Sequence, residues 1–237
     1  MIPLRDDNPT ARLSWTVLAI VAANLAFFAW MMRVSTSWWV PQGPAVDAII
    51  EWLAFVPAAL TADPLSPAVW ATVFTSMFVH AGWLHLGGNM LYLWIFGNNV
   101  EDRLGPPRFI AFYLACGVVA ILAQWSFARD SIVPVVGASG AIAGLLGAYL
   151  VLFPRAEVLT VIPLIFFFEV ASVPAWIVIG LFFVLQVAQA VVTMGHAGAG
   201  GVAFFAHIGG FLAGMVLALP LAGHDRWRRR KDGGRRR

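Results

Sequence analysis

Charged residues are scarce in this sequence. Asp, Glu, Lys and Arg make up 11% of the 237 residues, whereas apolar residues of the set AVILMFWYC make up 60%. A soluble domain carries about 25% charged residues, so this chain lacks the polar groups needed to coat a soluble globule. The scarcity excludes a soluble globular enzyme, a disordered chain and a soluble nucleic-acid module. It indicates an integral membrane protein.

Cysteine is also nearly absent, because Cys116 is the only one. A single cysteine excludes an intrachain disulfide framework and every metal site built from several thiolates. The sequence has no His-Glu-x-x-His motif, and His80 and His85 would diverge by roughly 140° on a helix. We therefore expect no metal and no cofactor, and we interpret Cys116 as an inert core residue.

Long unbroken apolar runs replace the alternating polarity that barrel strands require, so the membrane spans are predicted to be helices. A span needs about 20 residues. The predicted fold class is an all-α membrane protein with one six-helix domain over residues 13–222, between an N-terminal segment (1–12) and a basic tail (223–237). The six predicted helices are Leu13–Met32, Trp83–Val100, Phe109–Phe127, Gly137–Phe153, Val173–Val192 and Val202–Ala222.

Basic residues are unevenly divided between the two sides of such a bundle. With six helices both termini share one side, which holds 13 of the 15 Lys and Arg residues, while the other side holds Arg33 and Arg129. The positive-inside rule predicts that both termini are cytoplasmic. Eight basic residues between Arg226 and Arg237 predict a tail that binds anionic lipid, not nucleic acid. The compact loops favour a bacterial inner membrane.

Two connections between the predicted helices are rich in apolar residues. Segment 33–80 holds four tryptophans and is too long for a structureless loop, so it predicts a partly embedded element at the outer interface. The stretch Thr160–Val170 (TVIPLIFFFEV) contains Pro163 and Glu169. We interpret this stretch as an interfacial connector that leads into the fifth helix.

A few polar residues interrupt the apolar helices, and such residues are usually functional. His85, Ser139 and His207 each lie 16 to 18 residues before the charged residue that ends their own helix segment. At 1.5 Å per residue this is roughly 24–27 Å from the inner boundary of a hydrocarbon core about 30 Å thick. Three separate segments therefore place these side chains in one layer, slightly below the outer surface.

Glycines predict that the fourth and sixth helices pack closely. Two small-xxx-small patterns, each with glycines four residues apart, allow backbones to approach. His207 shares a helix face with Gly210 and Gly214, because their offsets are zero, three and seven. The predicted helix-packing glycines are Gly137, Gly140, Gly144, Gly210 and Gly214.

A serine next to a histidine is the minimal activated nucleophile. The imidazole of His207 would take the hydroxyl proton of Ser139 during attack and return it to the leaving amine. No acid residue lies near this layer, so the mechanism would be a dyad. His85 and Asn89 share a helix face and, with the backbone N–H of Ser139, would form an oxyanion hole.

Each of these residues also has a structural interpretation. A serine at a helix start is usually a cap, and a histidine at a tight helix contact is often structural. His85 and Asn89 could simply bridge helices by hydrogen bonds. The shared depth and the glycine faces favour the functional interpretation for the whole group.

At these residues the chain resembles the rhomboid intramembrane serine proteases. The matching stretches are HAGWLHLGGNMLYLWIFGNNVEDRLG (His80–Gly105), GASGAIAGLLGAYL (Gly137–Leu150) and AHIGGFLAGM (Ala206–Met215). The resemblance implies a six-helix bundle with a partly embedded first loop, the nucleophile Ser139, the general base His207 and an oxyanion hole of His85, Asn89 and the Ser139 amide. It also implies single-span membrane proteins as substrates, cleaved near the outer face.

The resemblance further implies a lateral gate between the second and fifth helices, around Trp176, Phe182 and Phe183. The chain departs from the family at several positions. Ala143 stands where some members carry a tyrosine that packs on the catalytic histidine, so another group must hold His207. The Trp-Arg pair of the first loop is absent, and Val202 replaces a glycine.

Two other functions stay open. One is a catalytically inactive rhomboid-like protein that binds membrane clients, although loss of Ser139 or His207 would be its expected mark. The other is a transporter or proton relay, which would need paired ionisable groups along a path across the bilayer. The polar groups here gather in one outer layer instead.

Overall fold

The structure, a computed structural model, describes residues 1–164, 167–193 and 203–222. Most of these residues are helical, and three strands form one small sheet. The helices are α1 (Trp15–Val34), α2 (Pro44–Leu53), α3 (Pro57–Ala62), α4 (Pro67–Thr75), the 3-10 turn η1 (Ser76–Phe78), α5 (Trp83–Leu104), α6 (Pro106–Phe127), α7 (Ser139–Leu152), α8 (Ala175–Thr193) and α9 (Phe204–Ala222). The strands are β1 (Ile2–Asp6), β2 (Glu157–Pro163) and β3 (Phe168–Pro174).

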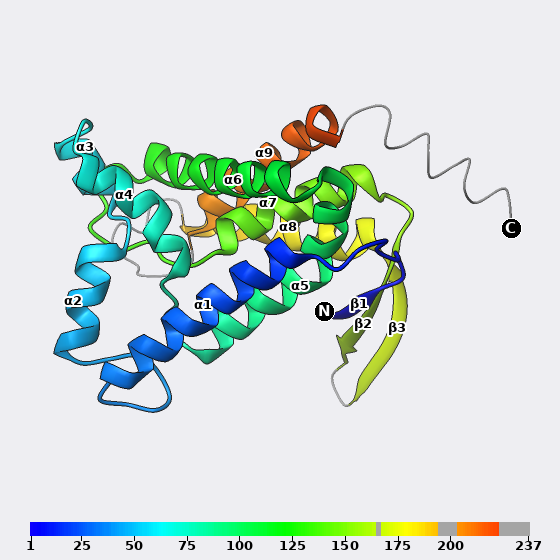
Figure 1. Cartoon of the computed structure of the whole chain (residues 1–237), viewed down its shortest axis with the longest axis horizontal. Coiled ribbons are helices and arrows are strands. Elements are labelled where there is room, and N and C mark those ends of the chain that lie inside the picture. Colours follow the sequence, from blue (N-terminus) through cyan, green and yellow to red (C-terminus); the bar gives the residue numbers. More distant parts are fainter. Residues whose placement is uncertain (165–166, 194–202, 223–237) are drawn as a thin grey trace, which may run out of the picture.

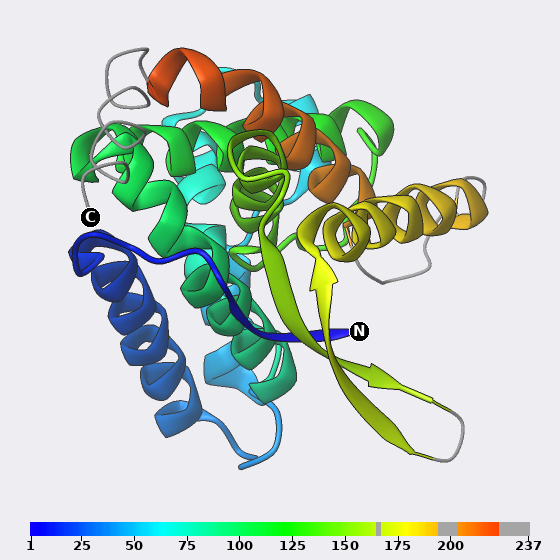
Figure 2. The ribbon, with the colours of Figure 1, turned by 90° about the vertical axis from the view of Figure 1, so that its right-hand side faces the viewer.

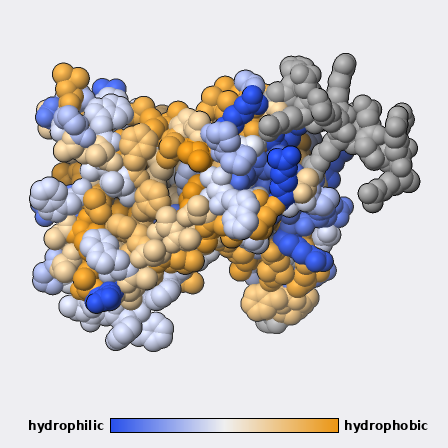
Figure 3. All heavy atoms as spheres, in the orientation of Figure 1, coloured by the Kyte–Doolittle hydropathy of each residue, from blue (hydrophilic) through white to orange (hydrophobic). Residues whose placement is uncertain are grey.

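The elements divide the molecule along its long axis. The short helices α2, α3 and α4 gather at one end, and the three strands lie at the opposite end (Figure 1). Long helices such as α1, α5 and α6 connect the two ends. Apolar residues cover the middle of the face in Figure 3, whereas strongly hydrophilic residues gather toward the end with the strands. An apolar band between two more polar ends is the surface expected of a membrane protein.

A helix occurs at each of the six predicted positions. Within the described residues, α1, α6, α8 and α9 are long and apolar enough to cross a membrane. α7 is apolar but has only 14 residues, and α5 has 22 residues with a more polar sequence that ends in charged side chains. The prediction of a mostly helical membrane protein is confirmed. The predicted start of the sixth helix at Val202 and the lipid-binding tail (223–237) lie outside the described residues.

The all-α prediction is wrong for the segment between α7 and α8. β2 pairs antiparallel with β3 and with the N-terminal strand β1, in the order β1-β2-β3. β2 contains a run of β-branched residues, and Val158 and Thr160 alternate with more exposed neighbours. This period of two favours a strand, and the prediction of an interfacial connector overlooked it.

Segment 33–80 is largely helical, with α2, α3, α4 and η1 in succession. Prolines at the first turns of α2, α3 and α4 begin these helices, because proline tolerates that position. An antiparallel bridge between Phe55 and Val135 ties the segment to the chain just before α7. The depth of this segment in the bilayer stays a prediction.

α7 lies at the centre of the molecule and packs closely against α9. A Cβ atom added at Gly210 would collide with the carbonyl oxygen of Gly140, and one at Gly214 would collide with that of Gly144. Gly147 similarly faces the backbone of Phe211. The two helices therefore meet backbone to backbone, as the small-xxx-small patterns predicted.

The N-terminal segment is anchored by carboxylates. Buried Glu101 of α5 accepts hydrogen bonds from the backbone N–H groups of Thr16 (3.1 Å) and Val17 (2.8 Å). It therefore caps α1, whose own N-cap Ser14 makes no side-chain cap bond. Asp6 of β1 accepts hydrogen bonds from the Tyr149 hydroxyl (2.5 Å) and from Nδ2 of Asn99 (2.6 Å).

Candidate functional site

The side chains of Ser139 and His207 meet where α7 and α9 cross. Ser139 is the first residue of α7, and His207 lies in the first turn of α9. The Ser139 Oγ and the His207 Nε2 are 2.7 Å apart, within hydrogen-bond distance. The tight glycine contact between these helices brings a hydroxyl and an imidazole together from positions 68 residues apart.

The helix-cap interpretation of Ser139 does not match the structure. Ala138 occupies the N-cap position, and no side chain caps the start of α7. The Ser139 hydroxyl faces His207 instead. Because the first N–H groups of a helix lack intrahelical partners, this end of α7 offers donors and a positive dipole end to an anion.

Gly137 is a loop residue and not a helix-packing glycine, which corrects the prediction. Its φ of +108° is a conformation that suits glycine, and its N–H donates to the carbonyl oxygen of Ser76 at 2.8 Å. A Cβ atom there would lie 2.6 Å from Nε2 of His85 and 3.4 Å from Nδ2 of Asn89. The bare backbone of Gly137 thus allows both α5 side chains to approach the loop before Ser139.

The contacts of His85 indicate where its proton lies. The backbone N–H of Ala81 donates to Nδ1 of His85 at 3.4 Å, so Nε2 carries the proton. Since Nε2 is the atom beside Gly137, His85 presents a donor toward the loop that ends at Ser139.

His80 holds Asn89 in place, a contact that the sequence did not reveal. His80 is fully buried; its Nδ1 donates to the carbonyl oxygen of Phe78 at 3.1 Å, and its Nε2 accepts from Nδ2 of Asn89 at 2.9 Å. Burial, with a smaller contribution from His85, lowers the pKa of His80 to about 4, so the ring is neutral near pH 7. The second N–H of the Asn89 amide is not used by this bond.

Two glutamines complete the surroundings of α9. Oε1 of Gln186, on α8, lies 2.6 Å from Nδ1 of His207. Oε1 of Gln124, on α6, accepts a hydrogen bond from the backbone N–H of Ala206 at 3.2 Å. These contacts could not be predicted from the sequence, because each joins residues far apart in the chain.

A large cavity adjoins these side chains. Its volume is about 1370 Å³, and Ser139, His207, His85 and Asn89 all line it, together with Phe182 of α8. The ring of Phe182 is near those of Tyr92 and His207, with centroid distances of 6.3 and 6.2 Å. The cavity is large enough for an extended peptide segment, and the aromatic pair of α5 and α8 borders it.

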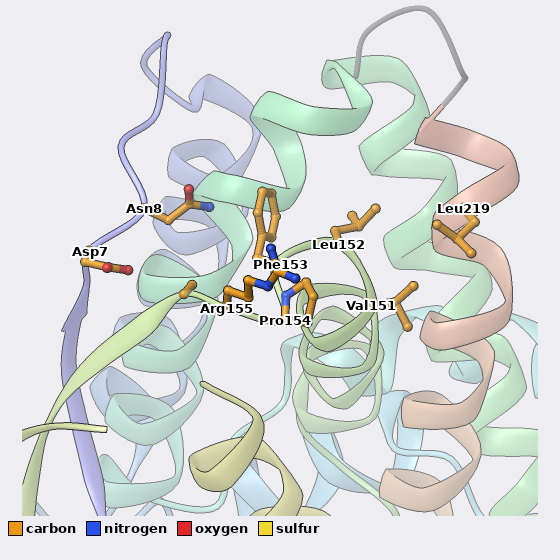
Figure 4. A pocket seen from close by; sticks show the side chains of 9 residues that line it. Asp7, Asn8, Val151, Leu152, Phe153, Pro154, Arg155 and Leu219 are labelled. Carbon is orange, nitrogen blue, oxygen red and sulfur yellow. The ribbon is translucent and has the colours of Figure 1, made fainter. Parts of the chain in front are cut away.

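A second cavity, of about 830 Å³, lies at the end of the molecule that carries the strands. It is lined by the segment after β1, by the turn after α7 and by Leu219 of α9 (Figure 4). Asp7, Asn8 and Arg155 are its polar side chains. It contains no serine or histidine, so the chemistry predicted from the sequence belongs to the first cavity.

In the described part of the chain, no group of three metal-ligating side chains comes together. Cys116 is buried in α6 against Gly144. Its surroundings are those of a packed core residue.

Comparison with known proteins agrees with the geometry. Residues 67–224 match the family model of the Rhomboid domain. The chain is 36% identical over 156 residues to "Rhomboid protease GluP" of Bacillus subtilis, and 33% identical over 153 residues to "Rhomboid protein 1, mitochondrial" of Saccharomyces cerevisiae. It is 31% identical over 237 residues to "RHOMBOID-like protein 2" of Arabidopsis thaliana.

These matches cover different shares of the proteins. They include 65%, 61% and 91% of this chain, and 27%, 40% and 69% of the Bacillus, yeast and Arabidopsis proteins, respectively. The chain thus spans less than half the length of the first two relatives. Their compartments differ, so the expectation of a bacterial inner membrane stays a prediction.

Proposed function

Because the chain belongs to the rhomboid family, we propose that it is an intramembrane serine endopeptidase that uses a Ser139–His207 dyad. The observation that carries this proposal is the 2.7 Å contact between Ser139 Oγ and His207 Nε2 at the wall of the large cavity. Its substrates are single-span membrane proteins, whose transmembrane segment reaches the cavity from the lipid.

The first chemical step is acyl transfer. Ser139 Oγ attacks the scissile carbonyl carbon while its proton moves to Nε2 of His207. The tetrahedral intermediate collapses when the C–N bond breaks, and the imidazolium gives the same proton to the leaving amine. Water then attacks the acyl-enzyme ester with His207 again as the base, which releases the acid product and regenerates Ser139.

The negative charge of the tetrahedral intermediate needs hydrogen-bond donors. The free backbone N–H of Ser139, Nε2–H of His85 and the unused N–H of Asn89 are the donors on this side of the cavity. His80 supports the hole without touching substrate, because it fixes the orientation of the Asn89 amide.

The proposed topology follows the charge distribution. α1, α5, α6, α7, α8 and α9 cross the bilayer, and the end with the strands faces the cytoplasm. Ser139 and His207 both lie near the N-terminal ends of their helices, away from the strands, and are then close to the outer face. Cleavage occurs there, within the outer part of the bilayer.

A catalytically inactive, client-binding relative is the alternative function. Such a protein has no need for a hydroxyl, an imidazole and three oxyanion donors around one cavity. The presence of the complete set favours the protease.

A cleavage assay tests the proposal. The full-length chain is reconstituted in vesicles with a single-span reporter, and Ser139→Ala and His207→Ala are compared with the unchanged protein. Both variants should lose cleavage, and a fluorophosphonate should label the unchanged protein but not Ser139→Ala. Undiminished cleavage by either variant would show that the dyad assignment is wrong.

A further inference from the structure

The hydrogen bond between Gln186 and His207 has no counterpart in the motifs that identified the site. We propose that Gln186 is the positioning residue of the dyad, holding Nδ1 of His207 so that Nε2 faces Ser139 without a proton. This inference rests on the proposed protease function. It also answers the departure at Ala143, whose methyl side chain is too small to support the imidazole as a tyrosine would.

The chemistry of the contact selects one tautomer of His207. An amide oxygen only accepts hydrogen bonds, so Nδ1 must donate to Oε1 of Gln186 across the 2.6 Å contact. The neutral ring then carries its proton on Nδ1, and Nε2 has a free lone pair directed at the Ser139 hydroxyl. This is the tautomer that a general base for Ser139 requires.

The position of Gln186 supports this role. His207 is only 8% exposed, and in the described part of the chain no carboxylate is hydrogen-bonded to it. The titratable side chain that interacts electrostatically with His207 is His85 of α5. Phe182, one turn before Gln186 on α8, contacts the imidazole ring. α8 therefore supplies both the hydrogen-bond acceptor and the ring contact that orient His207.

The test replaces the acceptor in the full-length protein in vesicles. Gln186→Leu removes the acceptor and should lower kcat by about 10- to 100-fold with KM nearly unchanged, because Gln186 is not among the residues that line the cavity. Gln186→Glu restores an acceptor and should recover most of kcat. The acid limb of the pH dependence of kcat should move to higher pH in this variant, because a carboxylate stabilises the imidazolium of His207. Val184→Ala, on the exposed side of α8, is the matched control and should leave kcat unchanged.

A spectroscopic measurement gives a readout that does not depend on cleavage. In Ser139→Ala protein with ¹⁵N-labelled histidine, His207 should show a protonated Nδ1 and an unprotonated Nε2, and Gln186→Leu should mix the two tautomers. If Gln186→Leu keeps its kcat and its tautomer, Gln186 is not the positioning residue. If Ser139→Ala still cleaves, the proposed function itself fails, so the two failures are distinguishable.

The three-stranded sheet carries a second, independent inference. Its register places Val161 opposite Ile2 and Val170, and Pro163 opposite Phe168, so these side chains share one face. Ile2, Val170 and Phe168 are 51%, 57% and 74% exposed, while Val158 and Thr160 of the other face are buried. The exposed face is therefore mostly apolar, and its charged residues in the paired strands are Arg5, opposite Leu159, and Glu157, opposite Pro174 at the end of the sheet next to α8.

The connectivity places this face at a membrane boundary. β3 ends at Pro174 and α8 begins at Ala175, so the sheet directly adjoins a helix long and apolar enough to span the bilayer. The hairpin projects sideways beyond the helices (Figure 2). We propose that the apolar face of the sheet lies on the bilayer surface, with its apolar side chains among the lipids and Arg5 near an anionic headgroup.

Spin labels test this placement because the chain has one cysteine. In a Cys116→Ala background, nitroxides at Phe168, Glu169, Val170 and Ala171 are compared in phosphatidylcholine–phosphatidylglycerol vesicles. Positions 168 and 170 should collide more with oxygen than with a water-soluble nickel chelate, and 169 and 171 should not. Preferential collision with nickel at 168 and 170 would overturn the proposal. If the labels have little access to either reagent and show dipolar coupling to one another, the face contacts a second copy of the chain instead of lipid.

Discussion

Replacing Gly214 by alanine should separate the two helices that hold the dyad. A Cβ atom at Gly214 would lie 2.6 Å from the carbonyl carbon and 2.7 Å from Cα of Gly144, whereas ordinary contacts begin at 3.4 Å. These are backbone atoms, so no change of side-chain rotamer can relieve the clash. α7 and α9 must then move apart by about 1 Å, an overpacking that costs about 1–3 kcal/mol of stability.

The displacement is large compared with the tolerance of the contact between Ser139 and His207. Ser139 begins α7 and His207 lies two turns before Gly214, and their 2.7 Å hydrogen bond would stretch beyond its normal range. A misplacement of about 1 Å can cost roughly 100-fold in rate. We therefore expect kcat/KM of Gly214→Ala to fall by about two orders of magnitude, even in protein that remains folded.

Gly180→Ala is the matched control for this experiment. Gly180 lies in α8 with nothing within 4 Å of an added Cβ, so alanine there should gain up to about 1 kcal/mol of helix propensity without a clash. Reporter cleavage and thermal unfolding are measured for both variants in the same vesicles. If Gly214→Ala cleaves within about threefold of Gly180→Ala, the backbone contact does not position the dyad.

Three further predictions concern residues around the bundle and the site. Glu101→Ala leaves the N–H groups of Thr16 and Val17 without a partner and should lower the free energy of unfolding by about 2–5 kcal/mol, measured by denaturant titration in detergent; a change within error would contradict the capping role. Because the pKa of His80 is about 4 in the folded protein and 6.5 in the unfolded chain, unfolding takes up a proton between these pH values. Stability should therefore fall by up to about 3 kcal/mol as pH drops through that range, and the loss should be smaller in His80→Gln. Gly137→Ala forces a methyl group against Nε2 of His85 in a backbone conformation that costs roughly 1–2 kcal/mol, so kcat should fall at least about tenfold; cleavage at the original rate would exclude His85 from the oxyanion hole.

The helical segments were predictable because each is encoded locally. Apolar runs of about 20 residues mark α1, α6, α8 and α9, and their length and apolar composition made them candidates for membrane helices. The three-stranded sheet was missed because its pairing is not local. β2 pairs with β1, about 150 residues earlier, and a short apolar run does not distinguish a strand from an interfacial segment.

The candidate site was predictable as a set of residues but not as a set of contacts. The glycine spacing indicated that α7 and α9 pack tightly, and the structure agrees, since Gly210 and Gly214 face the backbone of Gly140 and Gly144. The partners of the polar groups were not predictable. Hydrogen bonds from His80 to Asn89 and from His207 to Gln186 depend on side-chain orientations at element crossings.

The sequence by itself determined the membrane class and the resemblance to the rhomboid family, and it predicted Ser139 and His207 as the candidate pair. Composition and residue spacing carry this information. Burial in lipid requires a continuous stretch of apolar residues, and helix periodicity relates residues only a few positions apart. Only the tertiary structure decided that Gln186 holds His207, that His80 holds Asn89 and that the N-terminal strand joins the hairpin. Each of these contacts joins different secondary-structure elements, and their geometry depends on the packing of the whole bundle.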